Sequence, residues 1–362
     1  MVTLPSAIPP ILGHVVVTPR QFPTLLGRPS RLDSVTKIAL AIAGSEASGG
    51  AGAQTDLKTF HQLGVFGCTS LTCIVSFDPH NDWGHRFVPV DPQVIHDQIE
   101  AAVAVHGRVD AVKIGMLGTP TTIGVVAEAL ESYQFPKVIL DPVLICKGQE
   151  PGAALDTDNA LREKLLPRAD VVTPNLFETQ TLAGVDEITS VEALKDAAKR
   201  IGDQGVPVVI AKAGTLLDTG TALDVYYDGH DCEVLEVPAV GQERVSGAGC
   251  TLAAAITAEI AKGASALDAV RTAKQVVVSA IENRMHGNAP FDCVYQGNYR
   301  ARNHHKVHMM LALACDDAGA NLPLAPSDGP GRAAGWISRG RLGALRVLRS
   351  WRPGWLPKLR AR

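Results

Sequence analysis

The chain has 362 residues, of which 46% are hydrophobic, and its formal net charge is −3 at pH 7. A chain of this size can bury one large core, and one α/β domain with terminal tails fits it better than two equal domains. The small net charge provides no field that would steer the whole molecule toward a nucleic acid or a membrane.

The cysteines and the apolar runs also restrict the class of protein. Seven cysteines are scattered without a CxxC pair, so neither a disulfide framework nor a structural zinc site is expected, and a reducing cytoplasm is the natural compartment. No apolar run approaches the 18 residues of a membrane span, and the first residues lack the pattern of a signal peptide. We therefore expect a cytoplasmic protein with no membrane span and no nucleic-acid partner.

The order of the elements predicts an α/β fold. Residues 1–35 are rich in proline and indicate an N-terminal extension without fixed structure. From residue 36, continuous apolar runs typical of buried strands alternate with segments of helical spacing, which predicts a mostly parallel central sheet with helices on both faces. Strands are predicted within 37–44, 68–75, 110–117, 137–145, 169–175 and 206–214, and helices at 53–64, 92–105, 120–132, 157–166, 176–183, 190–203, 248–262 and 265–284.

The first strand leads into a glycine-rich turn, "AGSEASGGAGAQTDLK". Gly49, Gly50 and Gly52 allow the backbone to approach a ligand closely. Asp56 lies on the first turns of the helix that follows, where its carboxylate either accepts a hydrogen bond from a substrate or simply complements the helix dipole. Ligands of open α/β sheets bind beyond the carboxyl ends of the strands, and this turn falls there.

Two later strands also end in polar segments. "LDPVLICKGQEPG" leaves its strand at Asp141 and enters a loop that carries Cys146, and the proline and glycines predict a mobile cover. "TPNLFE" places Asn175 three residues before Glu178, which is the spacing of a helix capping box. The same carboxylate could instead hold Mg²⁺ through water. Taken alone, the local pattern favours the cap.

The last third of the chain contains a hairpin signal and a basic end. Asp228-Gly229 lies between two alternating runs, which predicts a hairpin at the sheet edge. After Tyr299 the alternation stops, and residues 301–362 hold 11 Lys or Arg against three Asp. We interpret them as a basic C-terminal tail without fixed structure rather than as a membrane-surface or partner contact. The predicted domain therefore spans 36–300.

The turn Gly247-Ala248-Gly249-Cys250 has the composition of an anion site. The sequence has no GxxxxGK[ST] and no GxGxxG after a strand, so a phosphate must be held in another way. Small residues at a helix start leave backbone N–H groups free to face a phosphoryl group in transfer, and the helix dipole is expected to lower the pKa of Cys250. The alternative is that the glycines only permit tight packing and that Cys250 is an inert apolar residue.

In this order, the motifs "AGSEASGGAGAQTDLKTF", "DAVKIGML", "DPVLICKG", "TPNLFE" and "GAGCTLAAAITAEIAKG" resemble those of the ribokinase-like superfamily, over roughly residues 37–300. Within it the chain is similar to the branch that holds hydroxymethylpyrimidine kinases and bacterial pyridoxal kinases. The resemblance implies a three-layer ribokinase-like fold and phosphorylation, by ATP with Mg²⁺, of a hydroxymethyl group on a heteroaromatic ring.

The resemblance also implies roles for individual residues. Gly247, Ala248 and Gly249 form the anion hole for the phosphoryl group, and Cys250 stands where most ribokinase-like enzymes have an aspartate base. The resemblance assigns Glu178 to the Mg²⁺–ATP site and so overrides the local preference for a cap. The other implied positions are Asp141 for the metal, Ala51, Asp56, Met116 and His85 for the substrate, and Asn175, Lys212, Ala213, Gly214, Thr215, Asp224 and Gly249 for the nucleotide.

Cys146 separates the two branches, because pyrimidine kinases usually have alanine at the matching position and dual-cysteine pyridoxal kinases have cysteine. A thiolate at Cys250 can trap the aldehyde of pyridoxal as a hemithioacetal, while Cys146, on a closing loop, relays the proton and excludes water. We therefore expect phosphorylation of pyridoxal, and also of pyridoxine and pyridoxamine, in vitamin B6 salvage. Hydroxymethylpyrimidine or its phosphate, in thiamin synthesis, is the alternative substrate.

Three further points complete the sequence-based hypothesis. The edge hairpin and the resemblance favour a homodimer. Pyridoxal kinases of this type tend to have three glycines in the nucleotide loop, where this chain has Ala213-Gly214-Thr215. An alternative from another class is a cysteine hydrolase that uses Cys250 with His61, His85 or His96, but none of these histidines stands in a recognisable triad context.

Overall fold

The computed structural model describes residues 36–144, 151–217, 219–241 and 245–300. The predicted N-terminal extension (1–35) and basic tail (301–362) lie outside the described residues, and so does Cys146. The domain boundaries and the role of Cys146 therefore stay predictions. No helix in the described part of the chain is long and apolar enough to cross a membrane.

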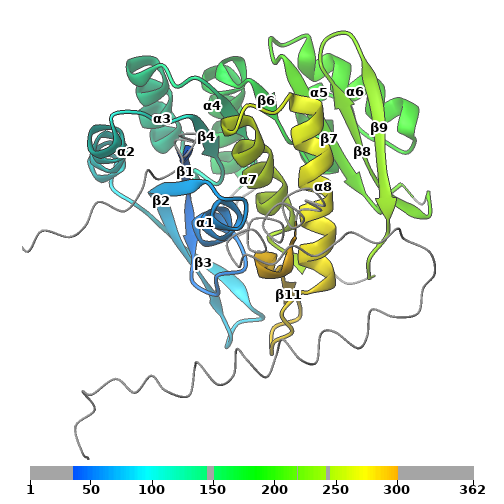
Figure 1. Ribbon diagram of the computed structural model, residues 1–362, viewed down its shortest axis with the longest axis horizontal. Coiled ribbons are helices and arrows are strands. Elements are labelled where there is room, and N and C mark those ends of the chain that lie inside the picture. The colour runs from blue at the N-terminus through cyan, green and yellow to red at the C-terminus, as the bar shows by residue number, and fades with distance from the viewer. Residues whose placement is uncertain (1–35, 145–150, 218, 242–244, 301–362) are drawn as a thin grey trace, which may run out of the picture. The chain divides into compact units, whose positions relative to one another are not determined.

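A sheet of nine strands runs through the described part of the chain (Figure 1), in the order β3-β2-β1-β4-β5-β6-β7-β8-β9. The six strands from β2 to β7 in this order are parallel, whereas β3 pairs antiparallel with β2 and β8 pairs antiparallel with both β7 and β9. The predicted edge hairpin at Asp228-Gly229 is confirmed. The strands are β1 (Ile38–Glu46), β2 (Phe66–Asp78), β3 (Gly84–Pro89), β4 (Ala111–Ile114), β5 (Val138–Leu140), β6 (Val171–Val172), β7 (Val208–Gly214), β8 (Thr221–Tyr227) and β9 (Cys232–Pro238), and β10 (Val245–Ser246) pairs separately with β11 (Asp292–Cys293).

Helices cover both faces of the sheet, as predicted. Helices α1, α7 and α8 lie side by side on one face, and α2 to α6 cover the other (Figure 1). Two short 3₁₀ turns, at Leu166–Arg168 and Gln296–Asn298, complete the domain. The α-helices are α1 (Gly52–Gln62), α2 (Pro92–His106), α3 (Pro120–Tyr133), α4 (Pro151–Lys164), α5 (Leu176–Ala183), α6 (Val191–Gly202), α7 (Ala248–Ala261) and α8 (Ala266–Glu282).

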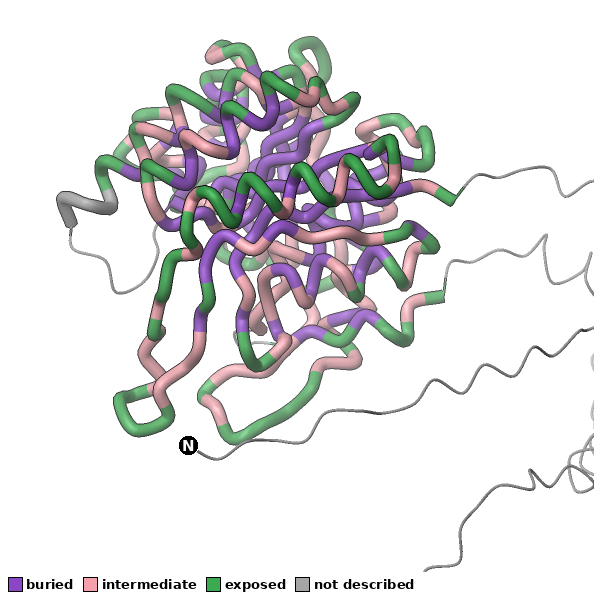
Figure 2. The backbone as a smooth tube through the Cα atoms, turned by 90° about the vertical axis from the view of Figure 1, so that its left-hand side faces the viewer, coloured by how far each residue is buried: buried purple, intermediate pink, exposed green. Residues whose placement is uncertain are grey.

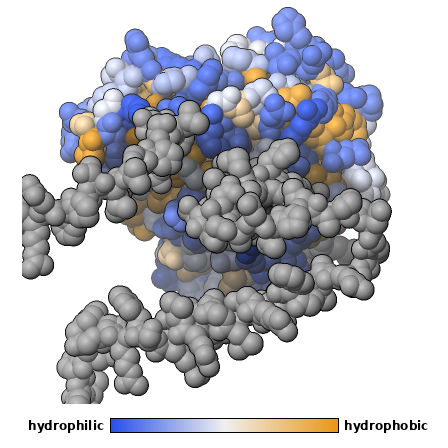
Figure 3. All heavy atoms as spheres, in the orientation of Figure 1, coloured by the Kyte–Doolittle hydropathy of each residue, from blue (hydrophilic) through white to orange (hydrophobic). Residues whose placement is uncertain are grey.

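The core follows from the apolar runs of the sequence. The backbone of the sheet is buried and the outer faces of the helices are exposed (Figure 2). Within β1, every residue from Ile38 to Ala43 is buried, because helices cover it on both sides. The visible outer surface of the described residues is largely hydrophilic, with scattered apolar side chains (Figure 3). A charged side chain interrupts the apolar core at β4, which carries a completely buried lysine, Lys113.

Several predicted site segments leave the sheet at the same edge. The first glycine turn follows β1, Met116 follows β4, Asp141 follows β5 and Asn175 follows β6. The carboxyl ends of parallel strands lie at one edge of a sheet, which is where ligands of such folds bind. The topology therefore brings these residues to one edge of the sheet.

Candidate active site

The start of α7 separates two cavities. The first, of about 280 Å³, lies between β8, the segment 237–241 and α8, and its polar lining residues are Lys212, Thr215, Asp224 and Lys274. The rest of its lining is largely aliphatic, including Leu252, Val277, Val278 and Ile281. A narrow apolar space with charged groups at its side fits a flat base joined to a charged group.

The second cavity lies on the other side of the same turn. It is lined by the β2–β3 connection from Asn81 to His85, by Phe77, by residues 245–249, and by Pro290 and Phe291. The ring of Phe77 lies 4.8 Å from that of His85 and 4.7 Å from that of Phe291, measured between centroids. An aromatic wall of this kind suits a planar ring. Val245, Ala248 and Gly249 line both cavities, so the two cavities adjoin at the start of α7.

Gly247 gives this turn its shape. It is the N-cap of α7 with φ 87°, in the left-handed region that favours glycine. A Cβ at Gly247 would overlap the carbonyl oxygen of Gly50, so the second glycine turn packs directly on the first. The N-cap makes no side-chain hydrogen bond and the first turn has no acidic residue. The helix therefore does not cap its own first N–H groups with a side chain, and the predicted anion site at this turn stays a prediction.

Glu46 holds the first glycine turn in place. Its buried carboxylate accepts hydrogen bonds from the backbone N–H of Ser48 (2.6 Å), from the Ser48 hydroxyl (2.6 Å) and from the backbone N–H of Gly50 (3.2 Å). Because Gly50 packs on Gly247, this carboxylate also sets the position of the second turn. Sequence reasoning missed this residue, although an acidic residue at the end of a buried strand was a signal.

Lys212, at the end of β7, connects the predicted nucleotide and metal residues. Its ammonium group bonds Asp141 Oδ1 at 3.0 Å, and the Thr173 hydroxyl donates to the same oxygen at 3.1 Å. Burial opposes ionisation of Asp141, but the charges of Lys212 and Lys113 hold its pKa below the usual value. A Cβ on Gly249 would lie 3.3 Å from Lys212 Nζ, so the lysine also reaches the start of α7.

The capping box is confirmed. Asn175 Oδ1 accepts from the backbone N–H of Glu178 at 3.0 Å, and Glu178 Oε2 accepts from the backbone N–H of Asn175 at 2.7 Å. Burial raises the pKa of Glu178 to about 7, against the opposing influence of Lys212, and the negative charge of Asp141 adds to the rise. The cap and the metal site are therefore compatible, because one carboxylate oxygen closes the cap while the second remains.

Cys250 lies in the first turn of α7, partly buried, with the backbone N–H of Gly52 near its sulfur. The expectation that the helix start lowers its pKa is wrong. Loss of solvent around the sulfur raises the pKa of Cys250 above its ordinary value, and the nearby charge of Lys113 only partly offsets this. The helix start is visible in the sequence, whereas the burial of the sulfur is not.

Asp56 forms a completely buried ion pair with Lys113, at 2.9 Å. Burial raises the pKa of Asp56 to about 6, although Lys113 opposes the rise. The side chain of Asp56 is 0% exposed, and the predicted contact with a substrate stays a prediction. Lys113 was missed, although a lysine within the apolar run "DAVKIGML" was a signal.

Asp224 also has a partner that the sequence analysis missed. Lys274, on α8, donates to Asp224 Oδ2 at 2.6 Å, and both residues are buried and line the first cavity. The signal was a single lysine on the apolar face of α8, between Val270, Ala273 and Val277.

The structure also shows where the remaining predicted residues lie. His85 and Gly247–Gly249 line the second cavity, whereas Ala51, at the start of α1, and Met116 are not among its lining residues. Of Ala213-Gly214-Thr215, only Gly214 has a positive φ, at 55°, so alanine at position 213 is compatible with this backbone.

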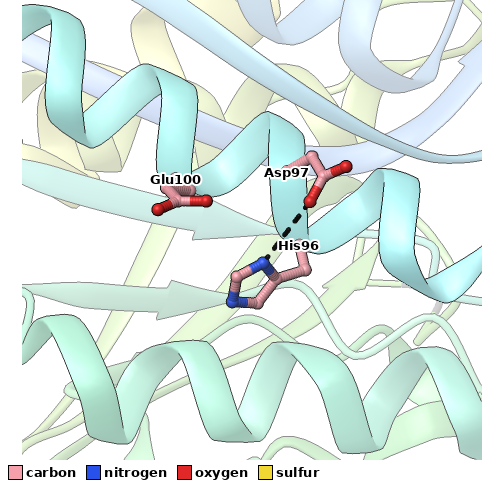
Figure 4. Close-up of side chains that lie close together, drawn as sticks. All are labelled: His96, Asp97 and Glu100. Atoms are coloured by element: carbon pink, nitrogen blue, oxygen red, sulfur yellow. Dashed lines mark ion pairs between the residues drawn. The ribbon is translucent and has the colours of Figure 1, made fainter.

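His96, Asp97 and Glu100 form a separate group on α2 (Figure 4), with potential metal-ligand atoms within 4.8 Å of one another. Asp97 and Glu100 are exposed, and Asp97 also accepts a hydrogen bond from Gln93. Helix α2 covers the face of the sheet opposite α7. The group is therefore outside the site, and His96 is not a base for Cys250.

Comparisons with known proteins place this arrangement in context. A family model described as phosphomethylpyrimidine kinase matches residues 46–292. Pyridoxine kinase of Bacillus subtilis (strain 168) is 44% identical over 244 residues, which cover 67% of this chain and 90% of that protein. Hydroxymethylpyrimidine/phosphomethylpyrimidine kinase of the same organism is 39% identical over 251 residues, 68% of this chain and 90% of that protein.

Solved structures confirm the predicted fold class. The pyridoxal kinase from Staphylococcus aureus in complex with AMP-PCP and pyridoxal is similar with a TM-score of 0.68 and 41% identity, over 73% of this chain and 94% of that chain. The ADP complex of Bacillus subtilis pyridoxal kinase is similar with a TM-score of 0.68 and 42% identity, over 72% of this chain and 97% of that chain.

Proposed function

The chain belongs to the phosphomethylpyrimidine kinase family, and we propose that it is a pyridoxal kinase. It transfers the γ-phosphoryl group of ATP to the 5′-hydroxymethyl group of pyridoxal, and also of pyridoxine and pyridoxamine, in vitamin B6 salvage. The observation that carries this proposal is the pair of cavities that meet at the start of α7. ATP occupies the first cavity, the vitamer ring occupies the second, and the phosphoryl group passes over Gly247–Gly249.

The chemical step follows from this placement. The hydroxymethyl oxygen forms a bond to the γ-phosphorus, the bond from that phosphorus to the bridging oxygen breaks, and ADP leaves with the electron pair. Backbone N–H groups of the helix start stabilise the negative charge on the transferring group, and Lys212 lies beside them. The sulfur of Cys250 receives the proton of the hydroxyl group.

Pyridoxal differs from pyridoxine in having an aldehyde. We propose that the thiolate of Cys250 adds to the aldehyde carbon and leaves a negative charge on the aldehyde oxygen. Cys146 then relays the proton of the hydroxymethyl group to that oxygen, which completes the hemithioacetal. In both roles the sulfur of Cys250 has to lose its own proton first.

The residues present fit a magnesium ion. Asp141 and Glu178 are two buried carboxylates, and the negative charge of Asp141 contributes to the raised pKa of Glu178; carboxylate oxygens are ligands that Mg²⁺ prefers. We propose that these two residues hold it, directly or through water. When bound, Mg²⁺ neutralises phosphate charge.

The test is a side-by-side measurement of kcat/KM for pyridoxal, pyridoxine and hydroxymethylpyrimidine with ATP and Mg²⁺. We expect the highest value for pyridoxal, with formation of pyridoxal 5′-phosphate followed by its absorbance. The second candidate, a hydroxymethylpyrimidine or phosphomethylpyrimidine kinase of thiamin synthesis, is favoured by the family match and by the 39% identical relative. A higher kcat/KM for the pyrimidine would establish that candidate instead.

We also propose a homodimer that works in the cytoplasm. Three apolar side chains at the β2–β3 edge support the dimer, because Phe66, Ile74 and Val88 are 51%, 44% and 60% exposed. Among the described residues, all five cysteines are free, in line with a reducing compartment. Light scattering on the purified protein tests the first proposal, since a monomer mass would exclude it, and cell fractionation tests the second.

A further inference from the structure

Lys113 is a charged residue in the middle of a buried strand, and the reaction proposed above gives it no role. It is 0% exposed, and its neighbours in β4, Val112 and Ile114, belong to the apolar core. Removing an ammonium group from water is costly even when it is paired. A hydrophobic residue would fill this position at lower cost, so the lysine needs another explanation.

The ion pair with Asp56 does not supply that explanation by itself. Lys113 Nζ bonds Asp56 Oδ2 at 2.9 Å, but the other oxygen, Oδ1, is buried and has no hydrogen-bond partner. A pair that leaves a buried oxygen unsatisfied is a poor stabilising device. The space beside the ammonium group depends on a glycine, because a Cβ on Gly115 would lie 2.7 Å from Lys113 Nζ.

Helix α1 brings Lys113 and Cys250 together. Gly247, three residues before Cys250, packs on Gly50, two residues before the start of α1, so the backbone N–H of Gly52 lies near the sulfur of Cys250. Asp56 lies four residues later on the same helix and bonds Lys113. Residues four apart lie about one turn, or about 5.4 Å, along a helix. The sulfur and the ammonium group therefore lie beside successive turns of one helix, and both α1 and β4 pack against α7.

Four charged groups act on the sulfur, from four different segments. They are Lys113 on β4, Asp56 on α1, Asp141 after β5 and Lys212 on β7. Lys212 and Asp141 are themselves paired at 3.0 Å, so their opposite charges largely cancel at a distance. Lys113 is the largest favourable influence on a negative sulfur, and Asp56 is the largest unfavourable charge.

We propose that Lys113 is a positioning residue that stabilises the negative charge of the Cys250 sulfur, and that Asp56 fixes the ammonium group and moderates its charge. The proposal rests on the proposed kinase function, in which that sulfur has to lose its proton before it receives one from the substrate or adds to its aldehyde. It explains why a charged pair is retained in the core at this place.

The test is the rate at which iodoacetamide alkylates Cys250 as a function of pH, followed by the mass of the peptide that carries it. Only the thiolate form of Cys250 reacts. At a pH below the pKa of the thiol, a variant whose Cys250 is a tenfold weaker acid is therefore alkylated about tenfold more slowly than the parent. For Lys113→Met we expect alkylation at pH 7.5 to fall by at least about threefold, and for Asp56→Asn to rise by at least about threefold. A merely structural role would move both rates in the same direction, since local opening exposes the thiol.

Two further variants complete the experiment. Lys113→Arg keeps the positive charge, so its alkylation rate should be close to that of the parent. This variant keeps the proposal testable if Lys113→Met folds poorly. Lys274→Met, the matched control, also removes a buried lysine paired with an aspartate, and it should leave the Cys250 profile unchanged. Changes in the same direction, or no change, in the first two variants would overturn the proposal. The assay needs neither vitamer nor ATP, so the absence of kinase activity would refute the proposed function separately.

Discussion

Replacing Gly249 by alanine separates the proposed catalytic role of the start of α7 from its structural role. Gly249 is the second residue of α7, lines both cavities and does not have a positive φ. Among the described residues outside its own helix turn, a Cβ at this position would meet the terminal nitrogen of Lys212, at 3.3 Å, which is the end of a flexible side chain. The added methyl group therefore fits the folded protein, but it would lie between the two cavities proposed for ATP and the vitamer.

The two expected effects have opposite signs. Glycine inside a helix is about 0.5–1 kcal/mol less favourable than alanine, so Gly249→Ala should unfold at the same temperature as the parent or slightly higher. Removing one donor of an oxyanion-type site costs about 10²–10³ in kcat, and displacing the phosphoryl group from these N–H groups is a comparable loss. We therefore expect kcat to fall at least about 10²-fold.

The assay combines thermal unfolding with kcat and KM for pyridoxal and ATP. The matched variant is Gly247→Ala. Its positive φ alone should lower the free energy of unfolding by about 1–2 kcal/mol, and the overlap of the new Cβ with Gly50 should lower it further. If Gly249→Ala keeps the parental kcat while its stability is unchanged, the phosphoryl group does not pass over this helix start and the reasoning is refuted.

Three further predictions concern the charges and thiols of the site. Because burial raises the pKa of Cys250, kcat with pyridoxine should rise with pH between 7 and 9 as the thiolate forms. This rise should disappear in Cys250→Asp. A flat pH profile of the parent would contradict the role of Cys250 as the base. Cys146→Ala should reduce kcat for pyridoxal more than for pyridoxine, and equal losses would exclude a role at the aldehyde. Lys212→Met leaves the buried carboxylates of Asp141 and Glu178 without their cation. The free energy of unfolding should therefore fall by about 3–5 kcal/mol, and Mg²⁺ should partly restore it. An unchanged melting temperature would show that Lys212 does not stabilise these two carboxylates.

Much of the fold could be predicted because burial on both faces leaves a continuous apolar run in the sequence. The runs around β1 and β7 are examples, and their strands lie at the predicted places. Strand β3 was missed because it is a short edge strand whose residues are largely exposed, so it carries no apolar run. The ends of α4 also differ, since the helix begins at Pro151 rather than at 157.

The site could be predicted where local chemistry is sufficient, and not where it depends on distant contacts. The capping box of Asn175 and the turn at Gly247 are local, and both are present. The partners Lys113 and Lys274 lie 57 and 50 residues from the aspartates that they bond, so no local pattern pairs them. The ionisation of Cys250 was predicted in the wrong direction for the same reason, because desolvation depends on the whole packed environment.

The direct packing of Gly247 on Gly50 has a consequence for how such an enzyme can change its specificity. Two chain segments separated by almost 200 positions touch without side chains between them, so neither can drift in sequence or shape unless the other moves with it. We therefore expect variation that adapts the protein to a new alcohol to be confined to the far rim, where the β2–β3 connection and Phe291 line the cavity proposed for the vitamer. Libraries aimed at new acceptors should vary that rim and leave both glycines untouched.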